Sequence, residues 1–248
     1  MPHTPSFDWR ERLGRQALGA LRPFWHAYPP QSPVSIFLLD IRGAMSPTEG
    51  FFYNRIPKAA NSTVMRRLTE VSTYRRPFVQ HEKDRFLRPS FLSRARVAEI
   101  VAGRTFCFTV VRDPYARVLS AYRDKVLQGR PQGVRHFGPD VRQSPPDFTT
   151  FCRFLEQGGL YLDAHWAPQT DLMVLPLHRF DLIGRVETLS TDLDTITRRI
   201  WNTPTLMPDR VGNVTEAERR ISADYTPEAR AIVARLYASD FAAFGYQV

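Results

Sequence analysis

Hydrophobic residues along the chain form short continuous runs separated by stretches with a helical period. The strongest run, 105–111, is β-branched, aromatic and almost wholly apolar, which predicts a buried parallel strand. Weaker runs predict further strands, at 51–53, 78–80 and 180–186. Helices are predicted at 61–71, 91–101, 114–127, 147–157, 189–200 and 226–237, with a long surface loop at 128–146 and another at 202–215. Strands alternating with helices indicate an α/β fold with a parallel sheet covered on both faces.

The beginning of the chain has a different pattern. Four apolar residues recur at four-residue spacing with arginines among them: Trp9, Leu13, Ala17 and Leu21. This spacing predicts a basic amphipathic helix within 7–25, and the prolines that follow interrupt regular structure. We interpret 1–33 as a basic arm and 34–248 as one domain. The helix is expected to pack on the domain, and docking on a membrane surface or a partner is the alternative.

Composition narrows the classes of partner. The formal net charge is +9, from 34 Lys and Arg against 25 Asp and Glu, which suits an anionic partner without choosing among nucleotide, nucleic acid, glycan and membrane. Two cysteines, Cys107 and Cys152, do not make a disulfide framework in a chain of 248 residues, so we expect buried free thiols. No apolar run approaches the roughly 18 residues of a membrane span, and no signal peptide is apparent, so a cytoplasmic location is expected.

The first candidate motif is 54–63, Asn-Arg-Ile-Pro-Lys-Ala-Ala-Asn-Ser-Thr, which follows a predicted strand and opens a predicted helix. Backbone N–H groups at such a junction bind phosphate, and Lys58 adds a charge while Ser62 and Thr63 add hydroxyls. The layout is that of a P-loop, but the stretch contains no glycine, which disfavours a nucleotide kinase. The alternative is an ordinary helix start with a nearby Lys and Arg.

The second candidate motif begins where the strongest strand ends. Arg112 stands at the carboxyl end of that strand, the edge at which open α/β sheets bind ligands. Ser120 lies two helical turns further on, and Arg117 precedes it by three residues, so these two side chains share a face. A guanidinium and a hydroxyl together can bind a phosphate. The alternative is a salt-bridged helix cap built on Asp113.

In this order and spacing the two motifs resemble those of the sulfotransferases that use 3′-phosphoadenosine 5′-phosphosulfate (PAPS). The resemblance implies their three-layer, P-loop-NTPase-like fold. It also implies the residues that hold the donor: Arg55, Lys58, Ala59, Ala60, Asn61, Ser62 and Thr63 at the 5′-phosphosulfate, and Arg112, Arg117 and Ser120 at the 3′-phosphate. The loop 209–213 is a further candidate, because Arg210 and a glycine would allow close approach to the nucleotide; an ordinary surface loop is the alternative.

Three further segments are similar to carbohydrate sulfotransferases of the chondroitin and dermatan 4-O and uronosyl 2-O type. They are the HWxPQ segment within 163–169, the DxIGxxExL segment at 181–189 and the closing YxxDFxxFGY at 237–246. This likeness implies a carbohydrate acceptor. It does not extend to that family's membrane anchor, or to the cysteine pair after HWxPQ, where Met173 and Pro176 stand here. Both differences suit a soluble, bacterial-type member.

Sulfuryl transfer would be an in-line displacement in which the protein positions the donor and neutralises developing charge. We interpret Lys58 as the group that stabilises the leaving phosphate oxygen, and the resemblance implies no metal. A histidine would accept the proton of the acceptor hydroxyl. His81, between the two motifs, is favoured, and His165 in HWxPQ is the second candidate, with orientation of the acceptor as its other role.

Two rival functions remain open. The first is sulfotransfer to a lipid, a phenol or a peptide. The second is a non-catalytic basic module that binds sulfated glycan or nucleic acid. Against the second, the cationic and hydroxyl residues stand at strand-to-helix junctions rather than on one continuous basic face, and RNA-binding motifs are absent. A nucleic-acid partner is therefore not expected, and the sequence leaves the oligomeric state open.

Overall fold

The structure, a computed structural model, describes residues 9–76, 84–203 and 224–248. Contacts divide the chain into two compact units. The first comprises Met1–Ile56, Ala60–Val110 and Asp171–Asp209, and the second comprises Pro57–Ala59, Val111–Thr170 and Arg210–Val248. The expected boundary between an arm and a single domain at residue 33 stays a prediction.

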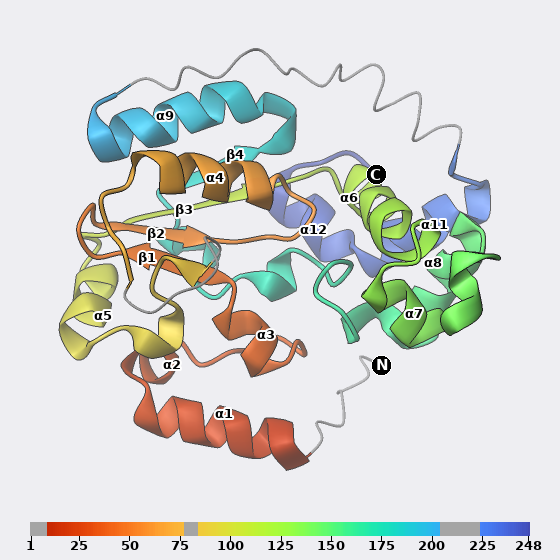
Figure 1. The fold of residues 1–248 in the computed structure, drawn as a ribbon, viewed down its shortest axis with the longest axis horizontal. Helices are drawn as coiled ribbons and strands as arrows, with labels where there is room; N and C mark the ends of the chain where they lie inside the picture. The colour runs from red at the N-terminus through yellow and green to blue at the C-terminus, as the bar shows by residue number, and fades with distance from the viewer. Residues whose placement is uncertain (1–8, 77–83, 204–223) are drawn as a thin grey trace. The chain divides into compact units, whose positions relative to one another are not determined.

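The first unit is built on a four-stranded sheet (Figure 1). Its strands are β1 (Gly43–Ser46), β2 (Phe51–Asn54), β3 (Phe106–Val111) and β4 (Leu182–Arg185), in the order β1-β2-β3-β4. β2 and β3 are parallel, whereas β1 is antiparallel to β2. The predicted α/β class with a mostly parallel sheet flanked by helices is confirmed. The antiparallel edge strand β1 was not predicted, because four residues with a glycine and a serine carry little strand signal.

Helices cover both faces of this sheet. Along β2, alternate side chains point to opposite faces. Phe51 and Tyr53 belong to one apolar cluster with Val64 and Leu68 of α4 (Asn61–Val71) and Leu193 of α9 (Leu189–Trp201). Phe52 stacks on Phe24 of α2 (Pro23–Ala27), with ring centroids 5.7 Å apart. The unit is completed by α1 (Trp9–Leu21), α3 (Ile36–Asp40), η2 (Pro89–Phe91), α5 (Arg94–Val101), η6 (Thr170–Leu172), η7 (Leu177–Arg179) and η8 (Val186–Thr188).

The second unit is helical. It begins with α6 (Pro114–Ala121), which runs directly into a π-helix, η3 (Tyr122–Leu127). The following elements are α7 (Pro131–Phe137), η4 (Pro139–Arg142), α8 (Phe148–Glu156), η5 (Gly159–Tyr161), α11 (Pro227–Leu236) and α12 (Ala238–Phe244). Its core is rich in aromatic side chains, among them the fully buried Phe151, Trp166 and Tyr237.

Most predicted elements are present, with three differences. The expected loop at 128–146 is wrong, since α7 and η4 lie within it, each opened by a proline at its first turn. The helix expected at 114–127 is two elements, because the second half adopts π geometry. The helix expected from 91 starts at Arg94, where Ser93 caps it. The strand expected at 78–80 and most of the loop expected at 202–215 lie outside the described residues.

Both cysteines are buried free thiols, as expected. Burial is the main cause that raises the pKa of each thiol to about 12, so neither is a ready nucleophile. Within residues 9–76, 84–203 and 224–248, no helix has the length and apolar character needed to span a membrane.

Candidate active site

The loop between β2 and α4 carries two residues with positive φ. Lys58 has φ of 65° and Ala60 has φ of 53°, both in the left-handed region that non-glycine residues seldom occupy. Such residues cost about 1–3 kcal/mol each and persist where the surroundings determine the backbone. The turn that glycines make in a P-loop is therefore made here by a lysine and an alanine, and the contacts of the loop must hold it.

A buried arginine supplies those contacts in the second unit. Arg117 on α6 is fully buried, and its Nε donates to the Pro57 carbonyl at 2.9 Å. Its other two nitrogens donate to the carbonyls of Ala167 at 2.8 Å and Ala164 at 3.2 Å. Burial lowers the pKa of Arg117, and the Asp240 carboxylate offsets part of this effect. These contacts give Arg117 a bracing role, which the motif did not indicate; its expected contact with the donor phosphate stays a prediction.

Arg112 is held beside the same loop. Its backbone N–H donates to the Gln169 side chain at 2.9 Å, and that side chain donates back to the Arg112 carbonyl at 2.8 Å. The Arg112 guanidinium donates to the Lys58 carbonyl at 3.4 Å. The second unit thus brings Lys58 and Arg112, one residue from each predicted motif, into contact. Ser120 is half-buried in the last turn of α6.

The remaining residues of the first motif are placed by the first unit. Arg55 is buried at the end of β2 and donates from Nε to Asn61 Oδ1 at 3.3 Å. Burial lowers the pKa of Arg55. Asn61, Ser62 and Thr63 form the first turn of α4, whose N-cap residue Ala60 makes no side-chain hydrogen bond. Ala59 is fully buried.

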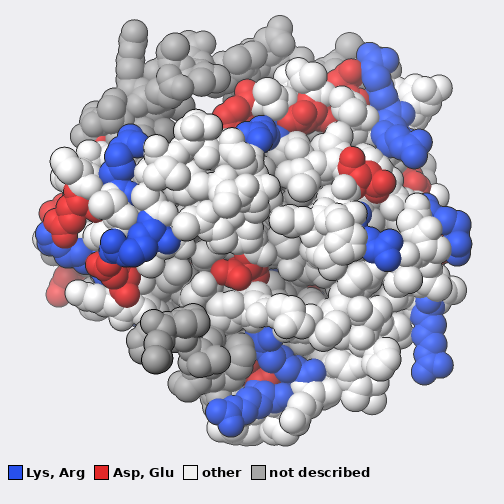
Figure 2. Space-filling view, turned by 180° about the vertical axis from the view of Figure 1, so that it is seen from behind, with Lys and Arg blue, Asp and Glu red and all other residues white. Residues whose placement is uncertain are grey.

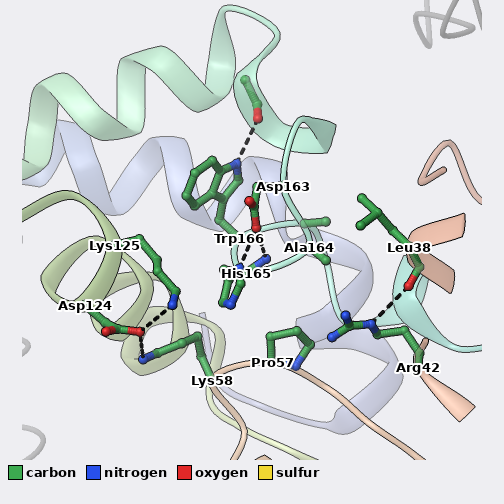
Figure 3. A network of polar contacts seen from close by, with 12 residues as sticks. Leu38, Arg42, Pro57, Lys58, Asp124, Lys125, Asp163, Ala164, His165 and Trp166 are labelled. Carbon is green, nitrogen blue, oxygen red and sulfur yellow. Dashed lines mark hydrogen bonds and ion pairs between the residues drawn. The ribbon is translucent and has the colours of Figure 1, made fainter. Parts of the chain in front are cut away.

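Lys58 forms an ion pair that the sequence analysis missed. Its Nζ lies 3.0 Å from Asp124 Oδ2, and Lys125 lies 3.1 Å from the same oxygen (Figure 3). Burial alone would raise the pKa of Asp124, but the hydrogen bonds from Lys58 and Lys125 outweigh it and lower that pKa. Asp124 lies on the π-helix η3, an irregular helix type often found at functional sites. The sequence signal for this ion pair was Asp124 itself, an acidic residue directly after the second motif.

His165 is paired with a carboxylate. The Asp163 Oδ1 atom lies 2.5 Å from His165 Nδ1 and accepts the His165 backbone N–H at 2.9 Å (Figure 3). Burial raises the pKa of Asp163, but the His165 hydrogen bonds and charge reverse the effect and hold that pKa below its usual value. A carboxylate on Nδ1 fixes the orientation of the imidazole and the tautomer in which Nε2 is the basic nitrogen.

Side chains near the end of the chain form hydrogen bonds with the backbone of the HWxPQ segment. The Asp240 carboxylate accepts the Gln169 backbone N–H at 2.8 Å and the Thr170 N–H at 2.9 Å. The Tyr237 hydroxyl donates to the Trp166 carbonyl, and the Trp166 indole N–H donates to the Gly159 carbonyl at 2.9 Å. These contacts hold the backbone on either side of His165 and the Gln169 that binds Arg112.

Two predicted site residues, His81 and Arg210, lie outside the described residues. Among the described ones, no three His, Cys, Asp or Glu side chains are grouped as metal ligands would be.

Comparison with known proteins decides the family. The profile described as "Sulfotransferase family" matches residues 42–247, nearly the whole of the chain. This chain belongs to the sulfotransferase family. The resemblance predicted from its motifs is thereby confirmed.

Curated relatives are named carbohydrate sulfotransferase 10. The chicken protein (Gallus gallus) is 28% identical over 68% of this chain and 54% of its own length. The orangutan protein (Pongo abelii) is 26% identical over 87% of this chain and 69% of its own length, and the human protein 28% over 67% and 54%. The chain thus spans about half the length of most relatives it matches. No solved structure matches it significantly.

The positive φ of Ala60 predicts that a glycine at this position stabilises the protein. Ala60→Gly is expected to raise the free energy of unfolding by about 0.5–1 kcal/mol, because glycine accepts positive φ without a Cβ clash. Thermal unfolding would measure this change. Ala59→Gly is the matched control: Ala59 is buried and outside the positive-φ region, so its variant should be less stable than the parent. Equal destabilisation by both substitutions would contradict strain at Ala60.

Proposed function

We propose that this protein transfers the sulfuryl group of PAPS to a hydroxyl of a carbohydrate acceptor. The observation that carries the proposal is the contact between the two motifs in the second unit, where Arg112 donates to the Lys58 carbonyl and Arg117 to the Pro57 carbonyl. Lys58 and Arg112 thereby lie next to each other. Two neighbouring cations suit a donor that carries phosphates at both its 5′ and 3′ positions.

The donor would be held by its charged ends. Lys58 and the first turn of α4 serve the 5′-phosphosulfate, whereas Arg112 and Ser120 serve the 3′-phosphate. In the reaction, the bond between sulfur and the 5′-phosphate oxygen breaks while a bond forms between sulfur and the acceptor oxygen. 3′-Phosphoadenosine 5′-phosphate leaves with the electron pair. Lys58 stabilises the negative charge that grows on the leaving oxygen.

His165 is the base that the described contacts support. Asp163 binds Nδ1, so Nε2 is the nitrogen that accepts the hydroxyl proton, and the carboxylate stabilises the imidazolium that forms. The sequence favoured His81, which lies outside the described residues and remains the second candidate.

A carbohydrate acceptor is favoured by two observations. The relatives are named as carbohydrate sulfotransferases, and the HWxPQ segment that this chain shares with such enzymes holds His165. A non-catalytic basic module gains no support from the one face that Figure 2 shows. On the face shown in Figure 2, Lys and Arg are scattered among acidic and uncharged side chains instead of forming one basic patch.

Donor binding is tested by calorimetry with the spent donor, 3′-phosphoadenosine 5′-phosphate. Arg112→Ala is expected to weaken its binding roughly 10- to 150-fold, because a charged hydrogen-bond partner worth about 1.5–3 kcal/mol is lost. Arg94→Ala, which removes an exposed arginine from α5, should leave the affinity unchanged. AMP should bind the parent more weakly. Equal affinity for AMP and the 3′-phosphorylated nucleotide would show that no 3′-phosphate is recognised.

The role of Lys58 is tested by turnover with radiolabelled PAPS and a panel of unsulfated oligosaccharides. Lys58→Met is expected to lower kcat by about 10²–10³-fold, because the leaving oxygen loses its stabilising charge. Lys125→Met is the control, since Lys125 contacts the same Asp124 oxygen but stands outside the loop. Equal losses in the two variants would assign the effect to the Asp124 ion pair instead of the leaving group.

The base is tested by the pH dependence of the same turnover. His165→Ala should lower kcat by about 10²–10⁴-fold with little change in nucleotide affinity, whereas the exposed His178→Ala should not. Asp163→Asn removes the charge that stabilises the imidazolium, so kcat should fall and the acid limb of its pH profile should move to lower pH. Loss of turnover in His81→Ala, with turnover retained in His165→Ala, would make His81 the base.

A further inference from the structure

Helix α1 presents its apolar face outward. The three large apolar side chains of this face are 63%, 55% and 75% exposed for Trp9, Leu13 and Leu21. Ala17, at the same spacing, is exposed as well. The helix is attached to the first unit by its other face, through Glu11 and Arg15. In Figure 1, α1 lies at the outer edge of its unit, beyond α2 and α3.

The opposite face attaches α1 to the rest of the first unit. Glu11 is buried, and its carboxylate accepts the Ile36 N–H at 2.6 Å and the Ser35 hydroxyl at 2.7 Å. Arg15 donates to Glu11 at 2.9 Å and to the Val34 carbonyl at 2.5 Å. These directional contacts fix the rotation of the helix, so the outward position of the apolar residues is a specified feature of the fold.

The outward face is also cationic. Arg10 and Arg12 are exposed in the first turn beside Trp9, and the Arg10 guanidinium lies 5.3 Å from the centroid of the Trp9 ring. Glu11, the single acid in the sequence of α1, points inward into its hydrogen bonds. Within residues 9–21, the exposed face therefore combines large apolar groups with positive charge, and the one carboxylate there, that of Glu11, points inward.

We propose that α1 is a docking surface for an anionic lipid membrane, on which the helix lies with Trp9, Leu13 and Leu21 in the interfacial region. Helices that bind in this way carry apolar side chains on one face and arginines beside them, and tryptophan is the side chain most suited to the interface. A second copy of the chain fits less well, because each copy carries a net charge of +9 and two like-charged copies repel each other. The proposal does not depend on the sulfotransfer reaction.

Vesicle flotation tests the proposal with the full chain. The protein is expected to float with vesicles of phosphatidylcholine and phosphatidylserine in equal parts, and much less with phosphatidylcholine alone. The triple variant Trp9→Ser, Leu13→Ser, Leu21→Ser should reduce the bound fraction by about tenfold or more. Arg10→Gln with Arg12→Gln should remove the preference for phosphatidylserine vesicles and leave residual binding.

Two controls keep the outcome decisive. Val101→Ser alters another exposed apolar side chain of the same unit and should not change flotation. Thermal unfolding of the triple variant should match the parent, since the three side chains are exposed and the Glu11 contacts are untouched. Flotation that is absent in the parent, or unchanged in the triple variant, would overturn the proposal. So would concentration-dependent dimerisation that the triple substitution abolishes, because the face would then bind a second copy.

Discussion

One buried guanidinium braces the second unit of this protein. Arg117 donates to the carbonyl of Pro57 in the strained loop and to two carbonyls of the HWxPQ segment. Three backbone acceptors are satisfied by one side chain that is itself fully buried, so removing it would leave a set of carbonyls without donors. The positive φ of Lys58 becomes tolerable because the preceding carbonyl is fixed in this way.

The position of Arg112 also depends on residues that are distant in the sequence. Gln169 exchanges two hydrogen bonds with the Arg112 backbone, and Asp240 accepts the backbone N–H of Gln169. The catalytic candidates thus rest on side-chain-to-backbone bonds, which specify geometry more tightly than apolar contacts do. In this chain, motifs far apart in the sequence support one another through these contacts.

The sequence was informative where a local pattern determines the outcome. The helix at 61–71 has its predicted bounds, and β3 follows from its run of apolar β-branched residues. It was uninformative where the outcome depends on long-range partners. The motif of Arg117 does not indicate the carbonyls that this side chain binds, and Asp124 reads as a surface acid until Lys58 is placed beside it. The apolar spacing of α1 predicted a helix but not that its face would point outward, because the buried Glu11 contacts involve residues 24 and 25 positions away.

The pairing of Lys58 with Asp124 bears directly on the proposed reaction. In this structure the charge of Lys58 is balanced by a carboxylate that also receives Lys125, and the three side chains are partly shielded from water. A donor bearing several negative charges would compete with Asp124 for the same ammonium group, so its binding strength reflects the difference between two ion pairs. Lys125 can stay with Asp124 when Lys58 turns to the donor, which keeps the carboxylate from being left unpaired. In the proposed reaction, a second lysine on the π-helix would thus free Lys58 for the donor without the cost of an isolated, partly buried charge.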